Sequence, residues 1–277
     1  MNAGEIDERA FQKVRADLDR WLGETGWGAS DPSWSHRRFE IGRIASKLPK
    51  GGTLLDVGSG PGFVPRYFHE LGVDVISVDY PGTGGLDALK VLMDLGIRGH
   101  YAQVGVDRLP LADNSVDVVF AGNIIEHLPI SPKSFMADLK RVIKPGGFLV
   151  MDTKNAVDLK TRLKVMWGVS NWAPLHSFYD LGIHPHHHKE YTLHELKQLF
   201  DLAGFRNNET FTEELFFILS LKKFRSLQAM GAKSNERSAF GRGFNPWQPY
   251  EYARLFFLLL TRLFPNLRSE IMVIGQK

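Results

Sequence analysis

The chain of 277 residues contains no cysteine. That absence excludes disulfide bonds, cysteine nucleophiles and metal sites built on thiolates. A large excess of one charge sign is also missing, because the formal net charge is only +3. General nucleic-acid binders usually carry a basic stripe, whereas Lys and Arg are scattered here and their densest cluster, at 221–226, is short. We therefore expect no nucleic-acid partner.

Long hydrophobic runs are absent as well. The strongest one, at 253–264, falls short of the ~20 apolar residues that a membrane-spanning helix needs, and arginines flank or interrupt it. The N-terminus has the pattern of a charged amphipathic helix rather than a signal peptide. We expect no transmembrane segment and a cytoplasmic location. The role of 253–264 stays open between peripheral membrane contact, a greasy substrate, the core and a homodimer interface.

What the chain does contain is an alternation of short apolar segments with helical patterns. Strands are expected at 53–57, 73–80, 100–106, 115–122 and 148–153, with helices between them at 62–72, 84–96 and 132–143. Short apolar strands that alternate with helices predict a parallel sheet covered on both faces, which is an α/β fold.

The flanking segments follow a different pattern. Two helices are expected before the first strand, at 5–22 and 34–48. After 153 we expect a helix at 155–167, a helix from an N-cap at Thr192 to a C-cap at Gly204, a strand at 206–214, mostly helix over 214–264 and a last strand at 269–277. Hydrophobic residues make up 43% of the chain, which suffices for one large domain with insertions.

The first strand ends in a glycine turn. Gly58, Gly60 and Gly62 have the spacing G-x-G-x-G, and Phe63 stands where the dinucleotide fingerprint G-x-G-x-x-G has its third glycine. Such a turn offers backbone N–H groups to a ligand. Asp79 ends the second strand, 21 residues after Gly58, where an acid suits the two ribose hydroxyls. An NAD enzyme is thus disfavoured but a nucleoside ligand is indicated.

Further motifs accompany this turn: LLDVGSGPG, VISVDY, LPLADNSVDVVFAGNIIEHL and RVIKPGGFLVMDT. Together they resemble the class I S-adenosylmethionine-dependent methyltransferases over roughly 52–153, and more weakly to about 205. The resemblance implies a Rossmann-like, doubly wound sheet of seven strands, mostly parallel with the last strand antiparallel. It implies one methyltransferase domain over 1–277, with N-terminal helices at 1–50, a cofactor-binding core at 51–153, acceptor-side insertions and helices at 154–265 and a final strand at 268–277.

The same resemblance assigns residues to S-adenosyl-L-methionine. The methionine part would be surrounded by Asp56, Gly58, Ser59, Gly60 and, at the end of the fourth strand, Asn123. The nucleoside part would be held by Asp79 at the ribose, by Tyr80 near the adenine, and by Val106 and Asp107. The last two are expected because the family's adenine-binding acid falls at Gly105 in this sequence.

Methyl transfer from a sulfonium needs alignment of the acceptor and exclusion of water. A hydroxyl acceptor also needs a base, because a neutral alcohol is a poor nucleophile. Glu126 and His127 follow the fourth strand, at the edge where open α/β sheets place their sites. We expect His127 to accept the proton and Glu126 to orient the imidazole or the substrate. A structural role for the pair stays open.

The acceptor side is marked by the segment HPHHHKEYT at 184–192. His186, His187, His188 and Tyr191 are expected to line the acceptor pocket. In an extended chain, His184, His186 and His188 share one face, so a divalent metal stays open without being assigned, with Asp152 or Asp180 as a carboxylate partner. This segment and 152–168 resemble, more loosely, methyltransferases that modify bacterial sugars and polysaccharides.

The sequence therefore predicts a methyltransferase that O-methylates a small molecule, with a sugar or oligosaccharide hydroxyl as the leading prediction for the acceptor. The enzymatic alternative is a lipid-like, quinone-type or amine acceptor. The alternative from another class is a regulatory protein that binds the cofactor without turnover, which the combined presence of Asp56, Asp79, Glu126 and His127 disfavours.

Overall fold

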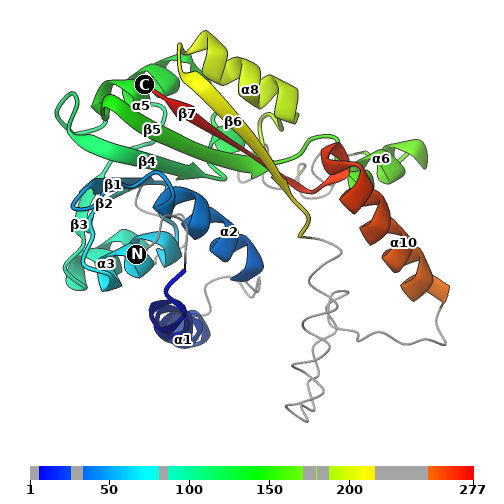
Figure 1. The fold of residues 1–277 in the computed structure, drawn as a ribbon, viewed down its shortest axis with the longest axis horizontal. Coiled ribbons are helices and arrows are strands. Elements are labelled where there is room, and N and C mark those ends of the chain that lie inside the picture. Colours follow the sequence, from blue (N-terminus) through cyan, green and yellow to red (C-terminus); the bar gives the residue numbers. More distant parts are fainter. Residues whose placement is uncertain (1–5, 26–33, 81–86, 171–178, 180–186, 216–248) are drawn as a thin grey trace.

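The computed structural model describes residues 6–25, 34–80, 87–170, 179, 187–215 and 249–277. Seven strands form one sheet in the order β3-β2-β1-β4-β5-β7-β6 (Figure 1). The strands are β1 (Thr53–Val57), β2 (Asp74–Asp79), β3 (Arg98–Tyr101), β4 (Val116–Gly122), β5 (Ile143–Lys154), β6 (Arg206–Glu213) and β7 (Glu270–Gln276). The carboxyl ends of β1, β2, β4 and β5 meet at one edge, because these strands pair in parallel.

The last strand runs against its neighbours. β7 is antiparallel to both β5 and β6, while every other pairing in the sheet is parallel. The predicted Rossmann-like sheet of seven strands with an antiparallel final strand is therefore confirmed. The strand predicted at 206–214 is also present, as the edge strand β6.

Helices cover both faces of the sheet, because consecutive residues of its central strands are apolar and point to opposite faces. One face packs against α1 (Glu8–Thr25), α2 (Trp34–Ala45), α3 (Phe63–Glu70) and α4 (Ala88–Asp94), and its strand residues include Leu54 and Val150. The other face packs against α5 (Pro132–Val142) and α8 (Leu193–Leu202), and its strand residues include Leu55 and Met151. Neighbours in sequence thus serve opposite layers, as strand geometry requires.

Helix termini follow the local signals. The Thr192 hydroxyl accepts a hydrogen bond from the Glu195 amide, and the Glu195 carboxylate accepts one from the Thr192 amide, which forms a capping box. At the other end of α8 the cap residue is Ala203, and Gly204 follows it in the left-handed region at φ 76°. The predicted start is confirmed, and the predicted C-cap lies one residue too late.

Three elements differ from the sequence prediction. β3 lies at Arg98–Tyr101 rather than 100–106, because Asp107 accepts a hydrogen bond from the Gln103 amide and bends the chain into a turn. β5 begins at Ile143 and includes the expected KPGG turn as an irregularity in its pairing with β4. The helix expected at 155–167 is shorter: α6 (Leu159–Met166) begins only after the Asp158 N-cap.

Two further elements, α10 (Pro249–Leu263) and the 3-10 helix η2 (Pro265–Leu267), precede β7, and α10 extends away from the sheet (Figure 1). Apolar side chains on α10 are exposed, among them Phe256, Leu259 and Leu263. Of the helices that the structure describes, none has both the length and the apolar character needed to cross a membrane. Peripheral membrane contact and a homodimer stay predictions. Of the mostly helical segment expected over 214–264, residues 216–248 lie outside the described residues.

Candidate active site

The three glycines after β1 have different surroundings. A Cβ atom on Gly58 would come within 2.0 Å of the Ile124 side chain, and one on Gly62 within 2.4 Å of Leu92. Gly60, at φ 49°, would direct a Cβ into open space, with no atom within 4 Å. Gly58 and Gly62 are therefore required by packing within the protein, whereas the backbone at Gly60 is open to a ligand.

Asp79 lies directly against this open turn. One of its carboxylate oxygens accepts a hydrogen bond from the Gly60 amide at 2.8 Å, and the other accepts one from the Tyr80 amide at 2.7 Å. Burial raises the pKa of the Asp79 carboxyl, although these two amide hydrogen bonds oppose the rise. Each oxygen retains acceptor capacity, so the pair of oxygens can still take two hydroxyls of a ligand.

Asp56 is more enclosed than the sequence suggested. Its side chain is only 2% exposed. Burial, then the neighbouring carboxylates of Asp79 and Glu40, raise the pKa of Asp56 to about 8, with Arg37 opposing. The Ser59 hydroxyl donates to the Asp56 carbonyl oxygen at 3.5 Å, and its nearness also lowers the pKa of the Asp56 carboxyl without offsetting burial. Contact of Asp56 with the charged part of a ligand stays a prediction.

The segment expected to meet an adenine starts next to Asp79, because the Ala102 amide donates to the Asp79 carbonyl at 3.1 Å. Val106 is 54% exposed and Tyr80 is 56% exposed, so both side chains are accessible at this edge. The Asp107 carboxylate is already engaged in closing its own turn through the Gln103 amide. A role for Asp107 in ligand binding stays a prediction.

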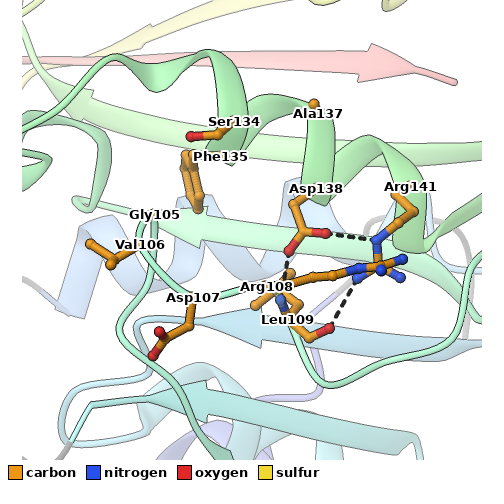
Figure 2. Close-up of a pocket in the computed structure, with 10 residues that line it drawn as sticks. All are labelled: Gly105, Val106, Asp107, Arg108, Leu109, Ser134, Phe135, Ala137, Asp138 and Arg141. Atoms are coloured by element: carbon orange, nitrogen blue, oxygen red, sulfur yellow. Dashed lines mark hydrogen bonds and ion pairs between the residues drawn. The ribbon is translucent and has the colours of Figure 1, made fainter.

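A hollow of about 380 Å³ lies between this segment and α5 (Figure 2). Its walls include Val106, Asp107 and Phe135. Its far end is closed by Arg141, which binds Asp138 and the Leu109 carbonyl oxygen. Neither Gly60 nor Asp79 lines this hollow. It therefore adjoins the expected adenine segment without forming the cofactor site.

Asn123 turns the chain at the end of β4. Its φ is 53°, a left-handed conformation that few residues other than Gly and Asn adopt readily. The Asn123 amide donates to the Asp152 carbonyl oxygen at 3.0 Å and to its carboxylate at 3.2 Å. This constrained turn leads into the 3-10 helix η1 (Ile125–His127), which carries both predicted catalytic residues.

Glu126 and His127 point to different environments. Glu126 is fully buried, and neither carboxyl oxygen has a hydrogen-bond partner among the described residues. Burial raises the pKa of Glu126; Thr153 and His187 lie near enough to oppose the rise, without meeting ordinary hydrogen-bond geometry. His127 is exposed. The pair therefore spans the boundary between the core and the surface.

The histidine segment packs directly on this pair. The Glu126 carbonyl oxygen accepts hydrogen bonds from the His188 amide at 2.7 Å and the Lys189 amide at 3.3 Å. The rings of His127 and His187 meet edge to face, with centroids 4.7 Å apart. A 2.9 Å hydrogen bond joins His187 Nδ1 to Glu190. The predicted catalytic and acceptor residues are thus brought together.

Of the other residues predicted to line the acceptor pocket, one is buried in the core and one lies outside the described residues. Tyr191 is 5% exposed and packs in the core with Leu196 and Phe200, while its carbonyl oxygen accepts a hydrogen bond from the Ala156 amide. His186 lies outside the described residues, as do His184 and Asp180. Contact of these side chains with an acceptor stays a prediction.

A buried charge cluster on α2 was missed by the sequence reasoning. His36 Nε2 lies 3.2 Å from Glu40 and 3.3 Å from Asp152, and His36 Nδ1 lies 2.9 Å from Glu213. Burial lowers the pKa of His36, but these carboxylates outweigh burial and raise it well above its ordinary value. Arg37 binds Glu40 at 2.7 Å. Burial raises the pKa of Glu40, but Arg37 and His36 outweigh it and hold that pKa at about 2.

The acids around this cluster share one face of the sheet. Asp56 and Asp152 each lie two residues beyond Leu54 and Val150, so both face the α1–α4 layer. Glu270 lies on the same face, and burial raises its pKa to about 8, with Asp152 adding to the rise and His36 opposing it. Burial likewise raises the pKa of Asp152 to about 6. The carboxyl edge therefore has two groups of ionisable residues, one under α2 and one around η1.

Each group contains three side chains whose ligand atoms lie within 4.8 Å of one another: Glu126, His127 and His187 in one, His36, Glu40 and Asp152 in the other. Asp152, expected as a partner of the histidine segment, instead binds His36. The spacing His36–Glu40 is the signal that the sequence could have offered, because it places both side chains on one side of a helix. Nothing local indicates that Asp152 and Glu213 complete the cluster.

Residues 55–151 match the family model described as a methyltransferase domain. Similar chains include an uncharacterised methyltransferase of Mycobacterium bovis, 39% identical over 106 residues, and one of Mycobacterium tuberculosis, 38% identical over 106 residues. The matched segment covers 38% of this chain and only 41% of each relative.

Solved structures resemble the chain over a longer range. The complex between the Haloferax volcanii Trm112 methyltransferase activator and the putative methyltransferase contains a chain with TM-score 0.56 and 14% identity, covering 98% of this chain and 99% of that one. Phosphoethanolamine N-methyltransferase 2 of Haemonchus contortus, solved with S-adenosyl-L-methionine, gives TM-score 0.55 and 16% identity, covering 96% and 57%. At these identities the likeness shows the fold alone.

The strand order of the sheet and its antiparallel last strand are those of the class I S-adenosylmethionine-dependent methyltransferase fold. The segment that matches a methyltransferase domain, residues 55–151, contains the glycine turn and Asp79. The predicted resemblance to that family is therefore confirmed, while the looser one to sugar-modifying members stays a prediction.

Proposed function

We propose that the protein transfers a methyl group from S-adenosyl-L-methionine to a hydroxyl of a small-molecule acceptor, a sugar or oligosaccharide. The observation that carries the methyl-transfer part is the open backbone at Gly60 with the Asp79 carboxylate fixed against it, in a methyltransferase domain. Asp79 would hold the ribose hydroxyls and Tyr80, Val106 and Asp107 would lie near the adenine.

The methionine part would lie toward β1 and β4. Asp56 lies near the end of β1, Gly58, Ser59 and Gly60 follow that strand, and Asn123 follows β4, so these residues lie at the carboxyl ends of two adjacent parallel strands. Open α/β sheets bind ligands outside the carboxyl ends of such strands. This position would present the methyl group toward η1.

The acceptor would lie on the β4–β5 side of the cofactor. Glu126 and His127 are there, and the segment around His187 and His188 packs on them. His127 is exposed and so can reach a bound hydroxyl. In the transfer, the carbon–sulfur bond breaks, a carbon–oxygen bond forms, and the sulfonium becomes a neutral thioether, while the hydroxyl proton passes to His127.

Support for a sugar hydroxyl comes from this imidazole and from the loose sequence resemblance to sugar-modifying enzymes. An amine or lipid-like acceptor is the alternative. The test is single-turnover transfer from methyl-labelled S-adenosyl-L-methionine to panels of sugars, amines and quinols, with product identified by mass. Transfer to a sugar, reduced about 10²- to 10⁴-fold in His127→Ala with cofactor affinity unchanged, supports the proposal. Transfer to amines only would overturn the acceptor class.

A further inference from the structure

Among the ionisable side chains around η1, Glu126, His127 and His187, the carboxyl group of Glu126 lacks hydrogen-bond partners among the described residues. The Glu126 carboxyl is fully buried, and neither of its oxygens has a hydrogen-bond partner in the described part of the chain. An unpaired buried carboxyl is costly, and such groups are normally hydrogen-bonded, paired or bound to a metal. Its neighbours include two imidazoles and no Lys or Arg side chain that binds it in the described residues.

The imidazoles are arranged for a shared ligand. His127 and His187 come from η1 and from the segment after 186, and their rings lie edge to face at 4.7 Å. One nitrogen from each ring and one oxygen of Glu126 all lie within 4.8 Å of one another. Two histidines and a carboxylate form the donor set that divalent transition metals accept, with further positions open.

Glu190 contacts His187 on the side of the ring away from the shared ligand position. It binds His187 Nδ1 at 2.9 Å, so the Nε2 atom is the one left to face another group. Histidines that bind metals characteristically donate their other N–H to a carboxylate, which fixes the ring and raises its basicity. The main-chain hydrogen bonds from His188 and Lys189 to the Glu126 carbonyl oxygen hold the two segments in register.

We propose that Glu126, His127 and His187 bind one divalent transition-metal ion, with Glu190 positioning His187. The donor set favours Zn²⁺, Co²⁺ or Mn²⁺ over Ca²⁺, which prefers oxygen ligands alone. Because Glu126 is buried and His127 is exposed, the ion lies where the core meets the surface, and its open positions face an incoming acceptor.

The role of the ion rests on the proposed methyl transfer, whereas its binding does not. The proton transfer to His127 proposed above applies to the chain without the ion, whereas with the ion bound His127 is a ligand and does not accept the proton. A hydroxyl that binds the ion has a lowered pKa, so its proton passes to solvent water before or during attack on the methyl carbon. Bond changes at sulfur, carbon and oxygen are the same as in the transfer without metal.

The test uses Co²⁺ alone and then Zn²⁺ alone, added to the full chain after treatment with a chelator. Visible absorption of Co²⁺ reports its ligands, and calorimetry gives the stoichiometry and affinity. We expect one ion per chain. Glu126→Gln and His187→Ala should each abolish the Co²⁺ spectrum of this site, and Glu190→Gln should weaken binding about 10- to 100-fold.

His194→Ala is the matched control, because His194 is exposed on the neighbouring helix α8 and belongs to neither group of candidate ligands. It should leave affinity and spectrum unchanged. Retained binding of S-adenosylhomocysteine by each variant shows that it is folded. Absence of stoichiometric binding, or equal binding in wild type and Glu126→Gln, would overturn the site, the latter by assigning the ion to other histidines. Failure of methyl transfer with metal binding intact would instead count against the proposed function.

Discussion

At the scale of single residues, Gly60 is a position where a substitution should affect ligand binding without disturbing the packing of the protein. A Cβ there meets no atom within 4 Å, so Gly60→Ala should fold with only the cost of a left-handed alanine, about 1–2 kcal/mol. It should nevertheless weaken S-adenosylhomocysteine binding, because the methyl group would occupy the ligand's approach. Thermal unfolding and calorimetry measure the two effects.

Gly146→Ala is the control for that substitution. Gly146 also has positive φ, 81°, and open space around its Cβ position, but it lies at the start of β5, away from the carboxyl edge. Both variants should lose similar stability, and only Gly60→Ala should lose affinity. Equal affinity in the two variants would remove Gly60 from the cofactor site.

Asp56 gives a prediction about pH. Its pKa is raised from 3.8 to about 8, so between these values the folded chain keeps a proton that the unfolded chain has lost. Raising the pH through this window therefore lowers the free energy of unfolding. In Asp56→Asn that contribution is absent, so its stability relative to wild type should increase from pH 4 to pH 8 and then level off.

Asp113→Asn is the comparison for Asp56. Hydrogen bonding to Arg141 lowers the pKa of Asp113, so the stability contribution of Asp113 is present above pH 3.8 and constant over the same window. Denaturant unfolding at a series of pH values measures both differences. A flat difference for Asp56→Asn would mean that its carboxyl is ionised in the folded protein.

At the scale of elements, α2 is held to the sheet by charge as well as by apolar packing. His36 joins Glu40 of its own helix to Asp152 at the end of β5 and Glu213 at the end of β6. His36→Ala would leave these acids facing one another, and removal of one partner from a buried ion pair typically costs about 3–5 kcal/mol. We expect α2 amides to exchange hydrogen faster than those of α5.

His69→Ala, at an exposed position in the last turn of α3, should leave the exchange of α2 unchanged. The pKa of His36 is raised, so its contribution to stability is present below pH 6.5 and is lost as the pH rises through the raised value. Unaltered exchange of α2 in His36→Ala would show that apolar contacts alone hold the helix.

The elements also show what sequence can and cannot predict. The strands before Asp56 and Asp79 and the cap at Thr192 depend on neighbouring residues, and all three were predicted. The predicted end of β3 was wrong, because Asp107 closes a turn that the spacing of apolar residues does not reveal. His36 and Glu213 are 177 positions apart, and only the completed sheet brings them together. The sequence placed Glu126 and His187 near the same acceptor pocket, but it did not predict the hydrogen bond between His187 and Glu190.

At the scale of the whole molecule, the carboxyl edge joins segments from nearly the full length of the described chain. α2 covers it from one side, and the 187–191 segment packs on η1 from the other. A ligand bound there should therefore stabilise the whole fold. At a concentration of 100 times its Kd, such a ligand adds about 2.7 kcal/mol to the free energy of unfolding. S-adenosylhomocysteine should raise the melting temperature, and NAD should not.

The central claim is that this edge binds the methyltransferase cofactor through Asp79 and Gly60. Its most direct test is calorimetric titration of cofactor-stripped protein with S-adenosylmethionine, S-adenosylhomocysteine and NAD. We predict one site for either sulfur compound, none for NAD, and a loss of about 1–3 kcal/mol of binding free energy in Asp79→Ala, because two ribose hydroxyls lose a charged acceptor. Absence of heat with both sulfur compounds, or full affinity in Asp79→Ala, would contradict the account.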